Sequence, residues 1–275
     1  MIGPAPSGPG VPGPGGGPAA GYPGPASPGP ASPRAARRVV IVTGGASGIG
    51  LAACRRLSRE GFAVAALDLK PDAVADAAAL AVRCDVTDPG DVHGAVAEVT
   101  ARLGPVDVLV NNAGITGSRS AARCHETPVE EWDAVQAVNV RGPFLCSRAV
   151  LPSMVERGAG HIITVASVAG LVAFPGRCAY TASKGAALML TRSIAVDYAA
   201  SGIRANAVCP GMVYTPMTSW RLDQPGLRAE VEERIPAGRV ATPEEIADAV
   251  ALLASGRLGY MTGAPLIVDG GMTAL

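Results

Sequence analysis

The 275-residue sequence has no excess of charge of either sign, because 23 basic and 23 acidic side chains give a formal net charge of zero. Proteins that bind nucleic acid usually show a strong basic excess, so the balance argues against that class. No uninterrupted apolar run approaches the roughly 18 residues of a membrane span, and the N-terminus lacks the charged and apolar regions of a signal peptide. We therefore expect neither nucleic acid nor a membrane as a partner.

Cysteine pairs and histidine clusters are missing as well. The six cysteines stand 22 to 40 residues apart without a CxxC pair, and His93, His125 and His161 stand alone. A disulfide framework needs denser cysteines, and a zinc site needs paired ligands. The sequence therefore predicts no metal site, and it predicts free thiols that suit a reducing cytoplasm.

The first 33 residues lack charge altogether and hold 10 of the 35 glycines and 11 of the 24 prolines. With few side chains to bury, such a segment cannot offset its ordering entropy. Its glycines do not recur strictly every third residue, which excludes a collagen helix. We expect a disordered Gly/Pro-rich tail over residues 1–35 and one folded domain over residues 36–275. A proline-rich docking tail and a translation start downstream of Met1 are the open alternatives.

The rest of the chain alternates short β-branched runs with longer helical patterns. Most runs are continuously apolar, which is typical of strands buried on both faces of a parallel sheet. The predicted strands are Val39–Thr43, Phe62–Leu67, Leu80–Cys84, Val106–Val110, His161–Ala166, Ile203–Val208 and Pro265–Val268, and the predicted helices cover about 48–60, 89–103, 130–157, 178–200 and 243–254. Asp88-Pro89 and Thr242-Pro243 are predicted helix starts. This alternation predicts a single doubly wound α/β domain of the Rossmann type, with a seven-stranded, mostly parallel sheet and helices on both faces.

A glycine-rich turn, Thr43–Gly50, joins the first predicted strand to the first helix. Glycines let the backbone turn sharply and approach a pyrophosphate, whose charge the helix N-terminus stabilises. The spacing is neither the GxGxxG of most dinucleotide folds nor a P-loop, and a plain tight turn is the alternative interpretation. The place of the turn in the predicted sheet favours a dinucleotide site.

Asp68 ends the second predicted strand, 18 residues beyond Gly50. A carboxylate at this place accepts hydrogen bonds from the adenosine ribose hydroxyls and repels a 2′-phosphate. No Arg or Lys lies inside the glycine turn to attract such a phosphate. The sequence therefore favours NAD over NADP as the cofactor, with a plain surface acid as the alternative interpretation of Asp68.

Tyr180 and Lys184 form a second signal, because the chain has only two lysines and a chance Tyr-x-x-x-Lys is expected only about 0.04 times. Residues i and i+4 of a helix share a face, so the phenol and the ammonium converge. A tyrosine with an ordinary pKa of about 10 is a poor base near neutrality, but a neighbouring cation, joined by an oxidised nicotinamide, lowers that pKa. A surface pair of the i,i+4 kind is the alternative.

These features belong to a longer set of motifs that stand in one order and spacing. The set consists of Thr43–Gly50, Asn111-Asn112-Ala113-Gly114, Ser167, Tyr180-Thr181-Ala182-Ser183-Lys184, Pro210-Gly211 and Val268-Asp269-Gly270-Gly271. As a set it resembles the short-chain dehydrogenase/reductase family over about residues 36–275.

The resemblance implies four catalytic residues. The counterpart of Tyr180 is the general acid/base at the substrate oxygen, that of Ser167 orients this oxygen, and that of Lys184 also bonds the nicotinamide ribose. The counterpart of Asn139 holds a water of a proton relay with its backbone carbonyl. Pro143, four residues later, has no N–H for this carbonyl, so we expect the carbonyl to be free at a local helix kink.

The resemblance also implies a set of cofactor contacts. These are Gly44, Ser47, Gly48, Ile49, Gly50, Asp68, Asp85, Val86, Asn111, Ala113, Gly114, Tyr180, Lys184, Pro210, Gly211, Val213 and Thr215. Asp85 and Val86 belong at the adenine, Asn111 and Gly114 near the ribose, and Thr215 at the nicotinamide amide. Taken alone, Asp85 has the pattern of a helix-cap or loop acid.

Two segments are expected to enclose the substrate. The region from about Met212 to Pro236 closes over the substrate in this family, as a helical lid that is mobile without ligand, and Gly170–Gly176 forms a second wall. The expected lining residues are Tyr214, Met217, Trp220 and Leu222 from the lid and Leu171, Val172 and Phe174 from the wall. Arg177 and Arg221 are available to clamp a carboxylate, although nothing in the pattern forces that role.

The leading interpretation is an NAD-dependent oxidoreductase that interconverts a secondary alcohol and a ketone by hydride transfer with a tyrosine acid/base, so the expected partner is a small-molecule substrate. A 3-oxoacyl-[acyl-carrier-protein] reductase that uses NADPH is the alternative within the same chemistry, and Asp68 argues against it. A nucleotide-sensing regulator would not need the four catalytic residues, and a serine hydrolase would need a GxSxG elbow that Ser167 lacks. By resemblance we expect a homotetramer in which the helices 130–157 and 178–200 pack across an interface.

Overall fold

The computed structural model describes residues 37–74, 76–118 and 122–274. The predicted tail over residues 1–35 lies outside these ranges, so its disorder stays a prediction. The described residues form one unit with a single central sheet.

Each strand of this sheet follows a predicted apolar run to within two residues. The strands are β1 (Val39–Thr43), β2 (Ala63–Asp68), β3 (Leu80–Arg83), β4 (Val106–Asn111), β5 (Gly160–Val165), β6 (Ile203–Pro210) and β7 (Pro265–Val268). They lie in the order β3-β2-β1-β4-β5-β6-β7, and every neighbouring pair is parallel. The predicted doubly wound, seven-stranded sheet is confirmed.

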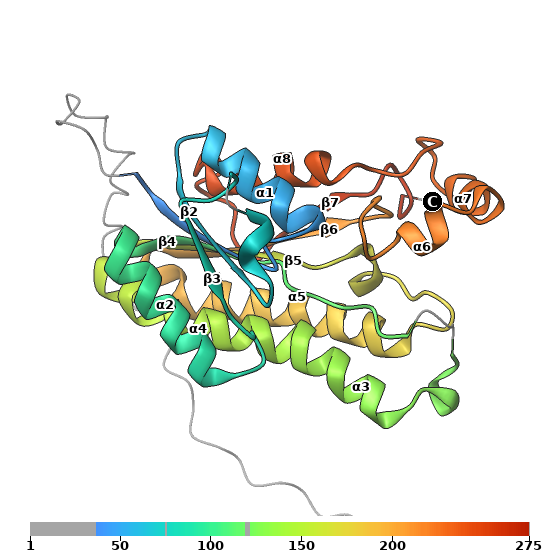
Figure 1. The fold of residues 1–275 in the computed structure, drawn as a ribbon, viewed down its shortest axis with the longest axis horizontal. Helices are drawn as coiled ribbons and strands as arrows, with labels where there is room; N and C mark the ends of the chain where they lie inside the picture. The colour runs from blue at the N-terminus through green and yellow to red at the C-terminus, as the bar shows by residue number, and fades with distance from the viewer. Residues whose placement is uncertain (1–36, 75, 119–121, 275) are drawn as a thin grey trace, which may run out of the picture. The chain divides into compact units, whose positions relative to one another are not determined.

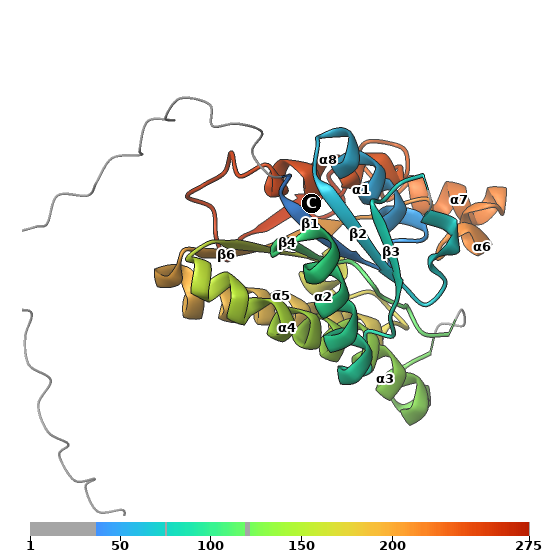
Figure 2. The same ribbon diagram turned by 60° about the vertical axis from the view of Figure 1, so that its left-hand side comes forward.

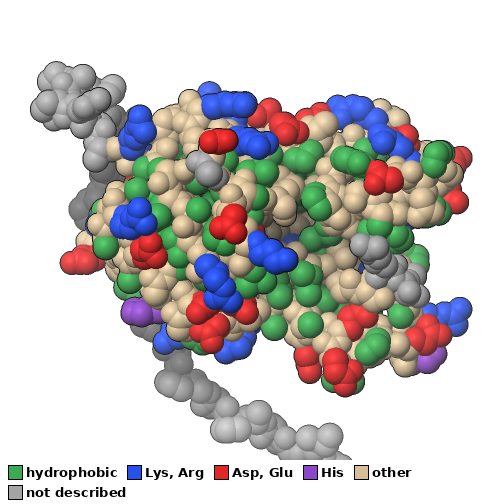
Figure 3. Space-filling model, in the orientation of Figure 1, with side chains coloured by type: hydrophobic (Ala, Val, Ile, Leu, Met, Phe, Trp, Pro, Cys, Tyr) green, Lys and Arg blue, Asp and Glu red, His purple; other side chains and the backbone are tan. Residues whose placement is uncertain are grey.

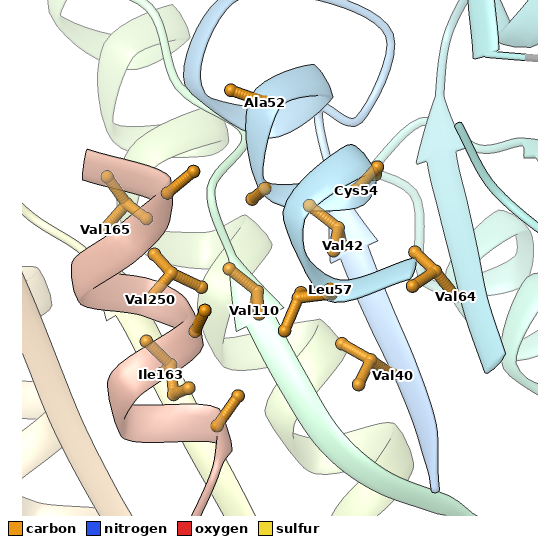
Figure 4. Packing of buried hydrophobic residues seen from close by; sticks show 14 of the residues in the cluster. Val40, Val42, Ala52, Cys54, Leu57, Val64, Val110, Ile163, Val165 and Val250 are labelled. Atoms are coloured by element: carbon orange, nitrogen blue, oxygen red, sulfur yellow. The ribbon is translucent and has the colours of Figure 1, made fainter. Parts of the chain in front are cut away.

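Helices cover both faces of the sheet (Figures 1 and 2). The helices are α1 (Gly48–Arg59), α2 (Pro89–Leu103), α3 (Val129–Gln136), α4 (Gly142–Arg157), α5 (Cys178–Tyr198), α6 (Ser219–Leu222), α7 (Pro225–Glu232) and α8 (Pro243–Ala254). On one face α1 and α8 bury a cluster that contains Val40 and Val42 of β1 (Figure 4). On the other face α2, α4 and α5 bury Val39 and Ile41 of the same strand. Because alternate residues enter two cores, a parallel strand is apolar throughout.

The strand order places a crevice beside β1. The chain leaves β1 toward β2 and β3 on one side and later adds β4 to β7 on the other side. In open α/β sheets, ligands bind at the carboxyl ends of the strands where the order reverses in this way. The segments after β1 and β4 therefore frame the expected ligand site.

Both predicted helix starts are confirmed. The carboxylate of Asp88 accepts the N–H of Asp91 at 2.8 Å and caps α2. Thr242 and Glu245 form a reciprocal capping box at the start of α8, with Pro243 in the first turn. These side chains satisfy backbone donors that a helix terminus leaves without a partner.

The predicted helix over 130–157 is wrong as one continuous α-helix. A π-helical turn, Ala137–Arg141, separates α3 from α4. Pro143 has no N–H to donate to the carbonyl of Asn139, so a regular α-helical ladder is interrupted at this point. The expected backbone irregularity at Asn139 is therefore present as a π-turn, a form that is frequent at functional sites.

The surface agrees with the balanced composition. On the face that Figure 3 shows, basic and acidic side chains are interspersed rather than gathered by sign. Among the described residues, no helix is long and apolar enough to cross a membrane.

Candidate active site

The glycine turn after β1 is closed tightly against the chain around it. Gly44 has a φ of +63°, a backbone conformation that side chains with a Cβ rarely adopt. A Cβ on Gly50 would collide with the carbonyl of Gly44 and would lie 2.5 Å from the amide nitrogen of Asn112. Glycine is therefore required at both ends of the turn.

The N-terminus of α1 suits an anionic group. Ser47 is the N-cap residue, is exposed, and makes no side-chain capping hydrogen bond. The first turn of α1 contains no acid. Free N–H groups and the helix dipole at such a terminus favour a phosphate. The residues present therefore fit a dinucleotide pyrophosphate.

Asp68 lies beside this turn at the end of β2. Its two carboxylate oxygens accept the N–H of Ala46 and the N–H of Lys70, each at 3.0 Å. A carboxylate has about four lone-pair sites, so two further hydrogen bonds can be accepted. Asp68 is thus placed both to hold the glycine turn and to bind ribose hydroxyls.

Asn112 and Thr43 join the ends of β1 and β4, although sequence analysis assigned them no role. The amide nitrogen of Asn112 donates to the carbonyls of Thr43 and Gly44 at 2.9 and 3.1 Å. The hydroxyl of Thr43 accepts the N–H groups of Asn112 and Ala113 at 3.0 and 3.1 Å. In the sequence, the only sign of this contact is that the amide of Asn112 directly follows β4. Its partner, Thr43, could not be predicted because the pairing depends on the strand order.

The three predicted catalytic side chains Ser167, Tyr180 and Lys184 come together at the same edge of the sheet. Ser167 lies two residues after β5, and its hydroxyl hydrogen-bonds to the Tyr180 side chain and accepts the N–H of Ala169 at 3.1 Å. Lys184, one turn after Tyr180 on α5, places its Nζ 5.6 Å from the centroid of the Tyr180 ring. The same Nζ donates to the carbonyl of Val165 at 3.0 Å.

Burial shifts both titratable groups away from their charged forms. Desolvation raises the pKa of Tyr180, and the hydrogen bond with Ser167 partly opposes this. Desolvation lowers the pKa of Lys184 from 10.5 to about 8. The expected lowering of the phenol pKa is therefore not produced by the protein's own groups, because the burial cost of a phenolate is larger.

Asn139 lies in the π-turn and is almost completely buried. Its side-chain oxygen accepts the N–H of Ile115 at 2.9 Å, and its Nδ2 donates to the Ile115 carbonyl at 2.8 Å and to the Ser183 hydroxyl at 2.9 Å. The side chain thus holds the loop after β4. That the backbone carbonyl holds a water stays a prediction.

The other predicted cofactor residues lie at or after the carboxyl ends of β3, β4 and β6, in the same edge region. The Asp85 carboxylate accepts the N–H and hydroxyl of Thr87, and these hydrogen bonds hold the pKa of Asp85 below its usual range. Asn111 turns its amide toward α4, where Nδ2 donates to Ser147 at 3.1 Å. Val86, Ala113, Gly114, Pro210, Gly211, Val213 and Thr215 complete the set at this edge.

The lid segment contains two short helices, α6 and α7. Leu222 of α6 is 2% exposed and packs with Val231, Ile235 and Val240 in a small core of the lid. The expectation that Leu222 lines the substrate site is thus weakened, since lid stability explains its burial. A cavity of about 530 Å³ lies between the lid and residues 240–242, and the four predicted catalytic residues are not among those that line it.

Exposed apolar side chains occur in the segments that follow three neighbouring strands, β4, β5 and β6. They are Ile115 after β4, Leu171 and Val172 after β5, and Tyr214 and Met217 after β6, each between 37% and 43% exposed. Isolated exposed apolar residues are ordinary, but five from three loops that follow neighbouring strands mark a binding surface. This agrees with the largely apolar walls that the sequence predicts.

The fold and the site together define an α/β oxidoreductase with a nicotinamide-cofactor site, and comparisons with known proteins support this class. The family model described as enoyl-(acyl carrier protein) reductase matches residues 44–273. The 2-(R)-hydroxypropyl-CoM dehydrogenase of Xanthobacter autotrophicus is 56% identical over 248 residues, covering 86% of this chain and 99% of the relative. The meso-2,3-butanediol dehydrogenase of Serratia marcescens is 40% identical over 88% of this chain and 96% of its own length.

A solved structure agrees as well. The short-chain type dehydrogenase/reductase from Mycobacterium marinum superposes with a TM-score of 0.80 at 35% identity, over 86% of this chain and 96% of that one. The protein belongs to the short-chain dehydrogenase/reductase family. It is an oxidoreductase that acts on CH–OH groups, which confirms the predicted enzyme class.

Proposed function

We propose that the protein is an NAD-dependent dehydrogenase that interconverts a small secondary alcohol and its ketone. The observation that carries this proposal is the convergence of Ser167, Tyr180 and Lys184 beside the glycine turn, at the carboxyl edge of the sheet. A bound nicotinamide would supply the hydride acceptor. The Gly44–Gly50 turn, Ser47 and Asp68 would hold its dinucleotide.

In the oxidation direction, the alcohol oxygen lies between the hydroxyls of Ser167 and Tyr180. Ser167 orients this oxygen, and Tyr180 removes its proton as the general base. Lys184 stabilises the phenolate by its charge. The proton would then pass from Tyr180 to solvent through a water held by the backbone carbonyl of Asn139, while Lys184 stays charged.

The substrate class rests on the relative that is 56% identical, which is named for 2-(R)-hydroxypropyl-CoM. Coenzyme M is a small thiol that carries a sulfonate. Its 2-hydroxypropyl thioether is therefore a secondary alcohol with a permanent negative charge. Arg177 begins α5 three residues before Tyr180, and Arg221 lies in α6 of the lid; both are half-buried. The planar guanidinium of arginine matches the oxygens of such an anion. We infer that the substrate is this compound or a close anionic analogue.

Initial rates with NAD⁺ test the proposal. The substrates are 2-(R)-hydroxypropyl-CoM, its (S) enantiomer, the neutral 2-(R)-hydroxypropyl ethyl thioether, meso-2,3-butanediol and a 3-hydroxyacyl thioester. We expect kcat/KM for the (R) anion to exceed that of the neutral thioether by about 10-fold or more, the size of one charged contact. A higher kcat/KM for the hydroxyacyl thioester with an NADP cofactor would favour the reductase alternative instead.

Cofactor choice is expected to depend on Asp68. In Asp68→Asn we expect the ratio of kcat/KM for NAD⁺ to that for NADP⁺ to fall about 10- to 100-fold, because the charge that repels a 2′-phosphate is removed. Steady-state kinetics with both cofactors measures this ratio. Asp72→Asn, at an exposed acid four residues later, is the control and should leave the ratio unchanged. An unchanged ratio in Asp68→Asn would contradict the NAD assignment.

Assembly and location follow as further parts of the proposal. We infer a homotetramer in which the long helices pack across an interface, and Met189 and Val196, 59% and 80% exposed on α5, support such a contact. Light scattering of the purified protein measures the assembly.

We infer a cytoplasmic location from the six cysteines, which are all free.

A further inference from the structure

Ser183 stands directly before Lys184 and is fully buried. Its hydroxyl accepts a hydrogen bond from the Nδ2 of Asn139 at 2.9 Å and donates to the carbonyl of Tyr180 at 2.7 Å. A serine inside a helix often donates to the carbonyl of the preceding turn. The bond from Asn139 is different, because it comes from another element of the fold.

The Asn139 amide has no donor to spare. One of its two N–H groups is used by the Ile115 carbonyl and the other by Ser183. Without the Ser183 hydroxyl, one buried N–H of the Asn139 amide would have no hydrogen-bond partner. Because an unsatisfied buried donor is costly, we expect the Asn139 side chain to move toward another acceptor. The Ser183 hydroxyl therefore holds the π-turn against α5.

The contact between Ser183 and Asn139 lies close to Lys184, the other residue assigned to proton transfer. A Cβ on Gly114 would lie 3.3 Å from the Asn139 side-chain oxygen and 3.5 Å from the Nζ of Lys184, so Asn139 and Lys184 approach the same small space. One turn earlier, Gln136 at the end of α3 donates to the carbonyl of Ala179 at 3.1 Å and joins α3 to α5. A displacement of the π-turn would change the distance between the Asn139 backbone and Lys184.

We propose that Ser183 is a positioning residue for proton transfer: its hydroxyl locks the π-turn that carries Asn139 onto the turn of α5 that carries Tyr180 and Lys184. This inference rests on the catalytic roles proposed above. Ser183 does not itself meet substrate or cofactor, and it acts through Asn139.

Several titratable or charged groups face this region. Cys209 of β6 lies close enough to Lys184 to interact with its charge, and the Ser167 hydroxyl and Val165 carbonyl face the pair from the end of β5. On another side of Tyr180, Glu131 of α3 and Arg177 line the same narrow cavity. The substitution tested below leaves all of these groups in place, so a changed pH profile reports on the path between them.

The test compares Ser183→Ala with Thr191→Val. Thr191 also lies on α5, is 2% exposed, and uses its hydroxyl in two bonds, to the Ala187 carbonyl and the Thr164 hydroxyl, each at 2.9 Å. Both variants remove one buried hydroxyl with two hydrogen bonds from one helix. The substitutions differ in that only the Ser183 hydroxyl contacts Asn139.

For Ser183→Ala we expect kcat at pH 7 to fall about 10-fold, with KM for NAD⁺ and for the alcohol within about 2-fold of wild type. The loss should shrink toward pH 10, because hydroxide then takes the proton directly, and the solvent deuterium isotope effect on kcat should increase. Thr191→Val should keep the wild-type pH profile and isotope effect even where its Tm falls equally. If Ser183→Ala does not fold, Ser183→Cys fills the site with a sulfur that is only a weak acceptor for Asn139 and should show the same pH-dependent loss.

A loss in Ser183→Ala that is independent of pH, or a profile equal to that of Thr191→Val, would overturn the positioning role. The wild-type rate separates this outcome from failure of the proposed function. An active wild type with an unchanged Ser183→Ala profile contradicts the present inference alone, whereas a wild type that oxidises none of the alcohols contradicts both.

Discussion

Tyr180→Phe is expected to lower kcat by about 10³-fold while the protein stays folded and still binds NAD⁺, with an affinity changed far less than kcat. General acid–base catalysis by one placed side chain contributes about 10²- to 10⁴-fold, and the Tyr180 hydroxyl, which hydrogen-bonds to Ser167, is the group proposed to remove the substrate proton. The aromatic ring remains, so packing near Lys184 is preserved. Single-turnover kinetics and NAD⁺ titration measure the two effects separately.

The matched control is Tyr198→Phe, at the end of the same helix, where the ring packs against the core beneath the sheet. That variant should retain nearly full activity. Because burial raises the pKa of Tyr180, wild-type kcat/KM for oxidation should rise with pH as the phenol loses its proton. A Tyr180→Phe variant within 10-fold of wild type would exclude the proposed base.

Lys184→Met is expected to raise the free energy of unfolding and, at the same time, to lower the catalytic rate. The ammonium is 6% exposed, and its pKa falls from 10.5 to about 8, so keeping it charged at neutral pH costs the folded state about 3 kcal/mol. Loss of its hydrogen bond to the Val165 carbonyl offsets about 1 kcal/mol of this. We therefore expect the free energy of unfolding at pH 7 to rise by about 2 kcal/mol, while kcat falls about 100-fold or more because the phenolate loses its cation.

The gain in stability should depend on pH with a definite sign. Between pH 8 and 10.5 the unfolded wild-type chain binds more protons at this lysine than the folded chain, so its free energy of unfolding rises with pH. The advantage of Lys184→Met is thus full below pH 8, shrinks as the pH rises, and is lost before pH 10.5, because the missing hydrogen bond to the Val165 carbonyl still counts against the variant. Urea denaturation at pH 7 and pH 10 measures it.

The other lysine of the chain is the control for this experiment. Lys70 is exposed after β2, so Lys70→Met should change the free energy of unfolding by less than about 0.5 kcal/mol at either pH. A destabilised Lys184→Met variant at pH 7 would show that the hydrogen bond of the ammonium outweighs its burial.

Much of the site could be predicted because its signals are local. The glycine turn requires residues without a Cβ at Gly44 and Gly50, and the pair Tyr180 and Lys184 shares a helix face by its spacing. Asp68 was found by the same kind of reasoning, since it ends a strand next to that turn. The resemblance then supplied roles for Ser167 and Asn139 that local patterns do not show.

The missed residues have partners that are distant in sequence. Asn112 contacts Thr43 because β1 and β4 are neighbours in the sheet. The hydrophobic pattern of a strand does not predict which strand pairs with it. Ser183 meets Asn139 because the π-turn lies against α5. Leu222 was expected in the substrate site, and the structure shows that it packs in the small core of the lid and also lines the cavity beside residues 240–242. Its role toward substrate stays a prediction.

The sequence by itself determined the alternation of strands and helices, the helix caps and the residue types at the catalytic edge, because propensity, periodicity and capping depend on neighbours in the chain. Only the tertiary structure decided the strand order, the π-helical form of the irregularity that Pro143 predicts at Asn139, and the direction in which burial shifts the pKa values of Tyr180 and Lys184. Those features depend on which distant elements exclude water from a group and supply its hydrogen bonds, and such contacts exist only after the chain has folded.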